Sequence, residues 1–150
     1  MLEHVNDHLG RLNIEGRFAV MAYGVIDLKK RELTVGNAGF PFPFLVRGGE
    51  LQRIELPGLP VGIQPDARYD SRKIPLESGD LLAFCSDGFA DCDNDKGEAF
   101  GERRVEKIVL AHADRPAQEL ALELLGATDR HADPNAPHTD DRTAVIFRLL

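Results

Sequence analysis

The spacing of apolar residues predicts three amphipathic helices. Apolar positions recur every three or four residues in three segments, which are 2–13, 102–112 and 117–125. In the first segment these positions are Leu2, Val5, Leu9 and Leu12. Pro116 suits the first turn of the third helix, and Gly126 suits its end.

Shorter apolar or alternating runs predict strands. The runs cover residues 17–28, 31–36, 44–46, 51–56, 69–76, 81–86 and 142–149. Gly48 and Gly49 separate two of these runs and are a strong hairpin signal. Residues 129–139, which include Pro134 and Pro137, are predicted to form a polar loop. Many strands followed by two helices and a returning strand predict a layered α+β domain.

One predicted strand, residues 81–86, ends abruptly in a carboxylate, that of Asp87. An almost continuous apolar run is typical of a strand buried on both faces. A carboxylate at the end of such a strand is costly to bury unless it is paired or coordinated. Asp140 and Asp141 precede a second apolar run, residues 144–147. Two carboxylates delivered by two core strands suit a hard divalent cation, although Asp-Gly is also common turn chemistry.

Composition narrows the class of protein. With 150 residues, 43% of them hydrophobic, the chain is long enough for one domain with a substantial core. No apolar stretch approaches the roughly 20 residues that span a bilayer, and the first residues lack the features of a signal peptide. These observations predict a cytoplasmic protein that does not contact a membrane. A net charge of −7 argues against nucleic-acid binding. Cys85 and Cys92 do not make a disulfide framework.

Six short motifs occur in order along the chain. They are Asn37-Ala38-Gly39 followed by Pro41 and Pro43, Leu59-Pro60-Val61-Gly62, Ser78-Gly79-Asp80, Ser86-Asp87-Gly88, Gly97-Glu98-Ala99-Phe100-Gly101 and Asp140-Asp141-Arg142-Thr143. Each motif is weak alone, but six in this order and spacing are specific. Over nearly its whole length, the chain resembles the metal-dependent protein phosphatases of the type 2C group. It is most similar to their bacterial branch of sporulation stage II protein E and the stress-response sigma-factor regulators.

The resemblance implies a layered α-β-β-α sandwich of antiparallel sheets flanked by helices. It implies that residues 1–150 form a single phosphatase-like domain, the C-terminal two-thirds of the family domain. Mn²⁺ or Mg²⁺ would be bound by Asp87, Asp140 and the backbone of Gly88, with Asp141 in a second tier. The implied reaction is two-metal hydrolysis of phosphoserine or phosphothreonine on a partner protein such as an anti-sigma factor antagonist.

Two departures from the family pattern change the expectation. The family carries another metal-binding aspartate in an N-terminal pattern like Gly-Asp-Val-Ser-Gly-His-Gly, which these 150 residues lack. The family also usually has His where Phe40 stands. We therefore expect the N-terminal part of the family fold and a bridging ligand to be missing. The 150-residue chain should be a poor phosphatase by itself, and a sheet edge left uncovered predicts a homodimer.

Two alternative functions stay open. The first is a catalytically incomplete pseudophosphatase that serves as a protein-binding module. The second, more remote, is a calcium-binding domain, because acidic residues stand at positions 1, 3, 5 and 12 of an EF-hand-like loop. These residues are Asp91, Asp93, Asp95 and Glu102. Lys96 occupies the sixth position, where an EF-hand needs Gly.

The histidines suggest no additional site. His4 and His8 are one helical turn apart, and an exposed pair on a helix is the favoured interpretation because no third ligand is nearby in the sequence. His131 and His138 fall in the predicted polar loop.

Overall fold

The computed structural model describes residues 1–12, 16–134 and 140–150. These residues fall into two compact units. The first is built from Met1–Phe42 and Glu55–Glu77, and the second from Pro43–Ile54 and Ser78–Leu150. Together they contain antiparallel sheets and helices, so the predicted α+β class is confirmed.

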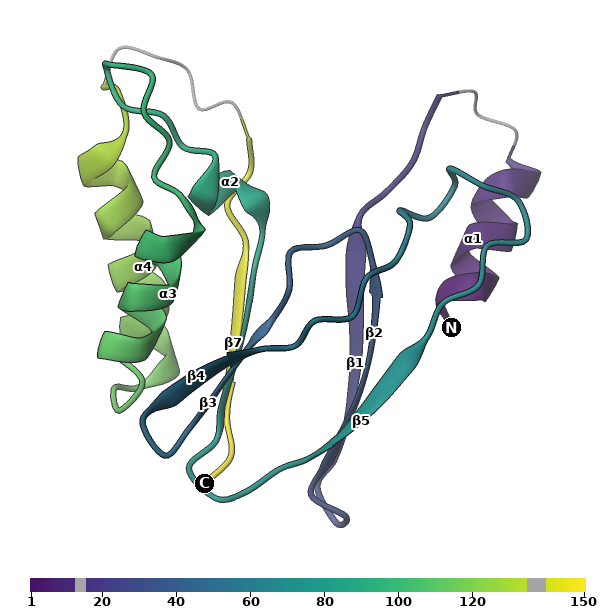
Figure 1. The fold of residues 1–150 in the computed structure, drawn as a ribbon, viewed down its shortest axis with the longest axis horizontal. Helices are drawn as coiled ribbons and strands as arrows, with labels where there is room; N and C mark the ends of the chain where they lie inside the picture. The colour runs from purple at the N-terminus through teal and green to yellow at the C-terminus, as the bar shows by residue number, and fades with distance from the viewer. Residues whose placement is uncertain (13–15, 135–139) are drawn as a thin grey trace. The chain divides into compact units, whose positions relative to one another are not determined.

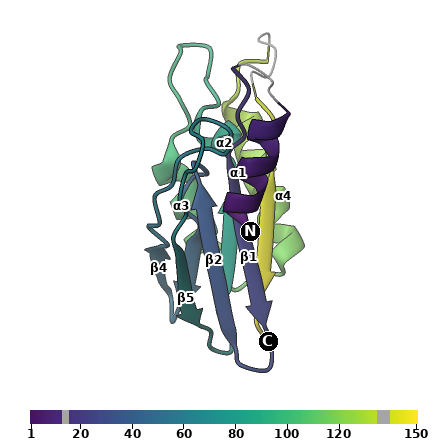
Figure 2. The same ribbon diagram turned by 90° about the vertical axis from the view of Figure 1, so that its right-hand side faces the viewer.

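The first unit is a helix packed on a three-stranded antiparallel sheet (Figure 2). Its elements are α1 (Leu2–Arg11), β1 (Met21–Asp27), β2 (Glu32–Ala38) and β5 (Ser71–Pro75). The strand order is β1-β2-β5. Leu2, Ala38 and Val61 form the buried centre of this unit, and Val5 and Leu9 pack against them. The first three positions of the apolar stripe predicted for this helix therefore face the core. The fourth, Leu12, lies beyond the end of α1 and is exposed.

A buried amide fixes α1 to a loop of the same unit. Asn6 is 2% exposed, and its Nδ2 donates to the carbonyl of Gln64 at 3.0 Å. Its Oδ1 accepts from the backbone N–H of Gly62 at 2.8 Å and from the hydroxyl of Tyr69 at 3.3 Å. Because these bonds satisfy the side chain, burying it carries little desolvation cost.

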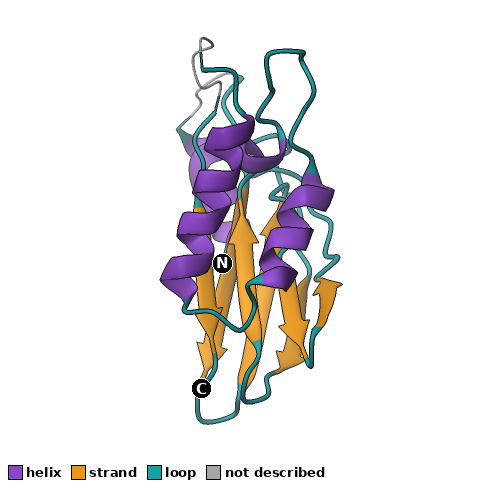
Figure 3. Ribbon diagram, turned by 90° about the vertical axis from the view of Figure 1, so that its left-hand side faces the viewer, coloured by secondary structure: helices purple, strands orange, loops and turns teal. Residues whose placement is uncertain are grey.

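The second unit is a four-stranded antiparallel sheet with helices on one face (Figure 3). Its strands are β3 (Phe44–Arg47), β4 (Glu50–Arg53), β6 (Leu81–Cys85) and β7 (Ala144–Arg148), in the order β4-β3-β6-β7. Its helices are α2 (Asp87–Ala90), α3 (Glu102–Ala111) and α4 (Ala117–His131). The core includes Val105, Val109, Leu120 and Leu124 from the helices, packed with Leu81 and other strand residues.

The Ser78-Gly79-Asp80 motif has a structural role at the start of β6. Asp80 is 2% exposed and accepts two bonds from Arg47 of β3, from Nε at 2.9 Å and from Nη2 at 2.6 Å. Gly79, at φ +90°, donates to the carbonyl of Leu149 at 2.7 Å. The bidentate pair compensates the burial of the carboxylate.

The hydrophobic pattern predicted most elements, with differences at their ends. The hairpin at Gly48 and Gly49 is confirmed, with both glycines at positive φ. The predicted end of the last helix at residue 125 is wrong. The helix continues to His131. Thr128 inside this extension bonds back to the preceding turn through its hydroxyl. Residues 129–131 of the predicted polar loop are therefore helical.

Five residues of that loop, 135–139, lie outside the described residues, and His138 is one of them. In the part of the chain that the structure describes, no helix has the length and apolar character needed to cross a bilayer.

The chemistry of Cys85 provides a first prediction. Cys85 is 6% exposed, and burial raises the pKa of its thiol to about 12. Since the thiolate is the reactive form, we expect iodoacetamide at about pH 8.5 to leave Cys85 unmodified in the folded chain. In concentrated urea Cys85 should react. Peptide mass spectrometry measures this, with the half-buried Cys92 as the internal comparison. Equal modification of both cysteines in the folded chain would contradict the burial.

Candidate active site

The pairing of β6 with β7 brings the two acidic segments to one end of the second unit. Cys85 at the end of β6 pairs with Ala144 at the start of β7. Asp87 follows the first strand and Asp140 precedes the second, so antiparallel pairing places both at the same edge of the sheet. Figure 1 shows α2 beside the chain that enters β7. The predicted neighbourhood of the two strands is confirmed.

Asp87 begins a one-turn helix that the sequence pattern did not predict. The strand ends at Cys85, and α2 spans Asp87–Ala90. The backbone N–H of Asp91 donates to the carbonyl of Asp87 at 2.8 Å. The side chains of Asp87 and Asp91 are therefore one helical turn apart. Asp91 is the C-cap residue of α2, directly after the helix. A four-residue helix is too short to show an apolar period, and only the four-residue spacing of the two aspartates indicates it.

Gly88 allows the two acidic segments to approach closely. A Cβ atom on Gly88 would lie 2.4 Å from the carbonyl oxygen of Asp141 and 3.3 Å from Cγ of Arg142. The first distance is shorter than any van der Waals contact, and the atom it meets is backbone. The sequence suggested a backbone role for Gly88 in metal binding, and the structure adds this packing role.

The segment before β7 is held on two further sides. The Asp140 carboxylate accepts a bond from the backbone N–H of Asp141 at 2.8 Å. Arg142 pairs with Asp129 of α4 at 2.7 Å, and the Arg142 side chain is only 14% exposed. The segment is therefore anchored to the last turns of α4 as well as to β6.

The electrostatics of the site reveal an acidic cluster. The pKa of the Asp91 carboxyl lies above its usual range. Desolvation contributes most to this shift, followed by the negative charges of Asp87 and Asp140 and then by those of Asp93 and Glu102. Asp87, Asp91 and Asp140 are all exposed residues. Carboxylates that repel one another in this way attract a divalent cation, which lowers their mutual repulsion.

The described side chains do not by themselves enclose a metal ion. Among the described residues, no set of three or more His, Cys, Asp or Glu side chains is grouped so that it could hold one. The described part of the site therefore offers exposed carboxylates that share an electrostatic environment.

The EF-hand-like loop is held by the side chain of Asn94 and by side chains of α3 and α4. Asn94 accepts bonds at Oδ1 from the backbone N–H groups of Lys96 and Glu98, at 2.9 and 3.0 Å. His131 bonds to the carbonyl of Glu98 at 2.8 Å. Arg104 pairs with the Glu98 carboxylate at 2.9 Å. The residues before the loop form the one-turn helix α2, which follows β6. His131 lies at the end of α4 rather than in a polar loop.

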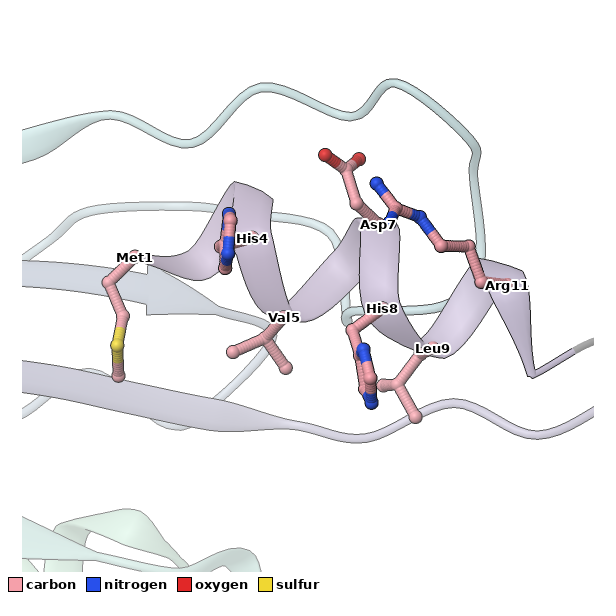
Figure 4. A pocket seen from close by; sticks show the side chains of 7 residues that line it. All are labelled: Met1, His4, Val5, Asp7, His8, Leu9 and Arg11. Carbon is pink, nitrogen blue, oxygen red and sulfur yellow. The ribbon is translucent and has the colours of Figure 1, made fainter.

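The histidines of α1 are exposed, as predicted. Figure 4 shows the surface hollow along α1, with His4 and His8 on its lining. The other lining residues, which also belong to α1 or precede it, are Met1, Val5, Asp7, Leu9 and Arg11. The hollow lies in the first unit, whereas the acidic cluster belongs to the second.

Solved phosphatase domains share this fold. The chain matches the SiaA-PP2C domain of Pseudomonas aeruginosa with a TM-score of 0.77, at 21% identity over 99% of this chain and 67% of that one. It matches the manganese-presoaked phosphatase domain of SpoIIE from Bacillus subtilis with a TM-score of 0.70, at 17% identity over 99% of this chain and 73% of that one. The fold is therefore that of a type 2C phosphatase domain.

The sequence comparisons identify the family. The model of the family Stage II sporulation protein E matches residues 1–150. Phosphoserine phosphatase RsbU of Bacillus subtilis is 28% identical over 134 residues, which cover 87% of this chain and 39% of RsbU. The chain belongs to the SpoIIE family. It spans less than half the length of the curated relatives it matches.

Proposed function

We propose that residues 1–150 act as one phosphatase domain that uses Mn²⁺ or Mg²⁺ to hydrolyse phosphoserine or phosphothreonine on a protein. The observation that carries this proposal is the placement of Asp87 and Asp140 at the paired ends of β6 and β7. Family membership supports the reaction class. The manganese-presoaked SpoIIE domain supports the choice of metal.

The oxygen donors of Asp87 and Asp140 suit a hard divalent cation in their chemistry, and water would have to complete the coordination because no three described side chains are grouped to hold a metal. Carboxylate, carbonyl and water oxygens are the ligands that Mg²⁺ and Mn²⁺ prefer, and Mg²⁺ is often held by only one or two carboxylates with several waters. Asp87 and Asp140 would hold the metal, with the backbone of Gly88 and, in a second tier, Asp141. We add Asp91 to this proposed set, since the charges of Asp87 and Asp140 act on its carboxyl. When bound, the metals supply a hydroxide near neutral pH and polarise the phosphoryl group.

The chain's own contribution is to hold acidic groups at a fixed edge. The β6–β7 ladder sets the separation of the two segments, and the lack of a side chain at Gly88 lets them pack closely. The Arg142–Asp129 ion pair fixes the segment before β7 against α4. The negative field of the cluster also disfavours a phosphate group until a cation neutralises it.

The proposed substrate is a phosphorylated signalling protein such as an anti-sigma factor antagonist. Its support is the family and the similarity to RsbU, which is named a phosphoserine phosphatase. This substrate class places the proposed reaction in the cytoplasm. A homodimer stays a prediction.

Phosphate release from a phosphoserine peptide and from p-nitrophenyl phosphate tests the proposal. With excess Mn²⁺ we expect slow turnover, because exposed carboxylates and water hold the metal weakly. We expect Asp87→Asn to abolish this turnover. Asp114→Asn is the matched control, since Asp114 is exposed in the turn between α3 and α4. Turnover that Asp87→Asn leaves unchanged would contradict the proposal. Mn²⁺ binding without any turnover would favour the incomplete, protein-binding alternative.

A further inference from the structure

Ser86 links the two acidic segments through its side chain. It lies between the end of β6 and the start of α2 and is partly buried. Its hydroxyl donates to the carbonyl of Asp141 at 3.1 Å and accepts from the backbone N–H of Thr143 at 2.9 Å. Its own backbone N–H donates to the carbonyl of Thr143 at 2.9 Å. Three hydrogen bonds therefore join this one residue to the segment that precedes β7.

The hydroxyl is not used for the local role that its position suggests. Ser86 is the N-cap residue of α2, where serine usually accepts a bond from a backbone N–H of the first helical turn. No side-chain cap bond is formed here, and the hydroxyl bonds across to residues 141 and 143 instead. The ladder of β6 and β7 ends at Cys85. The side chain of Ser86 thus extends the connection between the two segments beyond the last strand pair.

This connection is adjacent to both proposed metal ligands. Asp87 follows Ser86 directly, and Asp140 directly precedes Asp141, whose carbonyl accepts the hydroxyl. Carboxylates that share one cation must come within roughly 5 Å of each other, because oxygen–metal distances are about 2.0–2.6 Å. A small change in the separation of the two segments therefore has a large effect on a shared site. Gly88 limits how closely they approach, and Ser86 limits how far they separate.

We propose that Ser86 is a positioning residue of the metal centre, whose hydroxyl holds the Asp87 and Asp140 segments at the separation needed to share a cation. This inference rests on the proposed function, since it assumes that the two carboxylates bind one metal. Ser86 itself would contact neither the metal nor the phosphoryl group. Its hydroxyl acts on the backbone that carries the ligands, as outer-shell partners do in other metal sites.

Mn²⁺ binding by the purified 150-residue chain tests the inference without any activity assay. The electron paramagnetic resonance signal of free Mn²⁺ gives the affinity of the wild type and of Ser86→Ala, Ser86→Thr and Asp87→Asn. We expect Ser86→Ala to weaken binding roughly tenfold, the lower end of the range for outer-shell partners. Ser86→Thr should restore it, because threonine keeps the hydroxyl and suits the extended backbone of Ser86, at φ −69° and ψ 161°.

Thermal unfolding of the metal-free variants separates positioning from simple stabilisation. A purely structural Ser86 would lower the melting temperature on replacement by Ala and leave the Mn²⁺ affinity of the folded chain unchanged. That result would overturn the inference, as would a Ser86→Thr variant as weak as Ser86→Ala. If Asp87→Asn also binds Mn²⁺ like the wild type, the proposed function fails. If Asp87→Asn loses binding while Ser86→Ala keeps it, only the role of Ser86 fails.

Discussion

Replacing Leu124 by Ala should destabilise the second unit by about 2–5 kcal/mol. Leu124 on α4 is 0% exposed and belongs to the core cluster with Leu120, Val105 and Val109. Truncation removes apolar burial and leaves a cavity that the close-packed surroundings refill only in part. Because single domains are only marginally stable, an effect of this size removes a large share of the stability.

Leu122→Ala is the matched control for this prediction. Leu122 lies on the same helix, but 59% of it is exposed, so the same truncation should change the free energy of unfolding by less than about 0.5 kcal/mol. Urea unfolding followed by helical circular dichroism measures both variants. Equal losses for Leu122→Ala and Leu124→Ala would show that α4 does not pack as described.

Gly88→Ala should destabilise the second unit and weaken Mn²⁺ binding. The added Cβ would lie 2.4 Å from the carbonyl oxygen of Asp141, so α2 or the 141–142 backbone must shift. Overpacking of this kind costs about 1–3 kcal/mol. The shift also separates the proposed ligands Asp87 and Asp140, and the metal affinity should fall with it.

Gly126→Ala tests whether the effect is specific to that contact. Gly126 is also helical, in α4, and its added Cβ would meet only the flexible end of Arg130 at 3.1 Å. Alanine in a helix interior is favoured over glycine by roughly 0.5–1 kcal/mol. We therefore expect Gly126→Ala to keep or raise the stability and to leave Mn²⁺ affinity unchanged. Urea unfolding measures the stability of both variants, and Mn²⁺ titration measures their metal affinity. A Gly88→Ala variant that behaves like Gly126→Ala would contradict the close approach at Gly88.

Apolar periodicity predicted the elements that are long enough to show a period. The stripe of α1 and the run of β6 follow from residue spacing alone, because each buries a face whose period the sequence displays. The α2 helix was missed since four residues cannot display that period. The length of α4 was underestimated because Gly126, a common helix terminator, lies inside it. The packing of α4 against the core overrides the tendency of glycine to end a helix.

The two acidic segments of the candidate site were predictable from the sequence, and the contacts that hold them together were not. Asp87 and Asp140 stand out because each adjoins an apolar run, and the pairing of β6 with β7 confirms that these runs are neighbours. Pairing partners depend on tertiary structure, and hydrophobic patterns do not specify them. The roles of Ser86 and Gly88 were inaccessible for the same reason, since both act on residues more than fifty positions away. Asp91 joined the site only once α2 placed it one turn from Asp87.

The central claim is that Asp87 and Asp140 bind one divalent cation together. A double-mutant cycle of Mn²⁺ affinity with Asp87→Asn, Asp140→Asn and the double variant tests it directly, with Asp114→Asn as the control. We predict that each single change weakens binding, that Asp114→Asn does not, and that the double change costs clearly less than the two single changes added together. Residues that share one ligand are coupled in this way. Additive losses, or a single variant with wild-type affinity, would show that the two carboxylates do not share a metal.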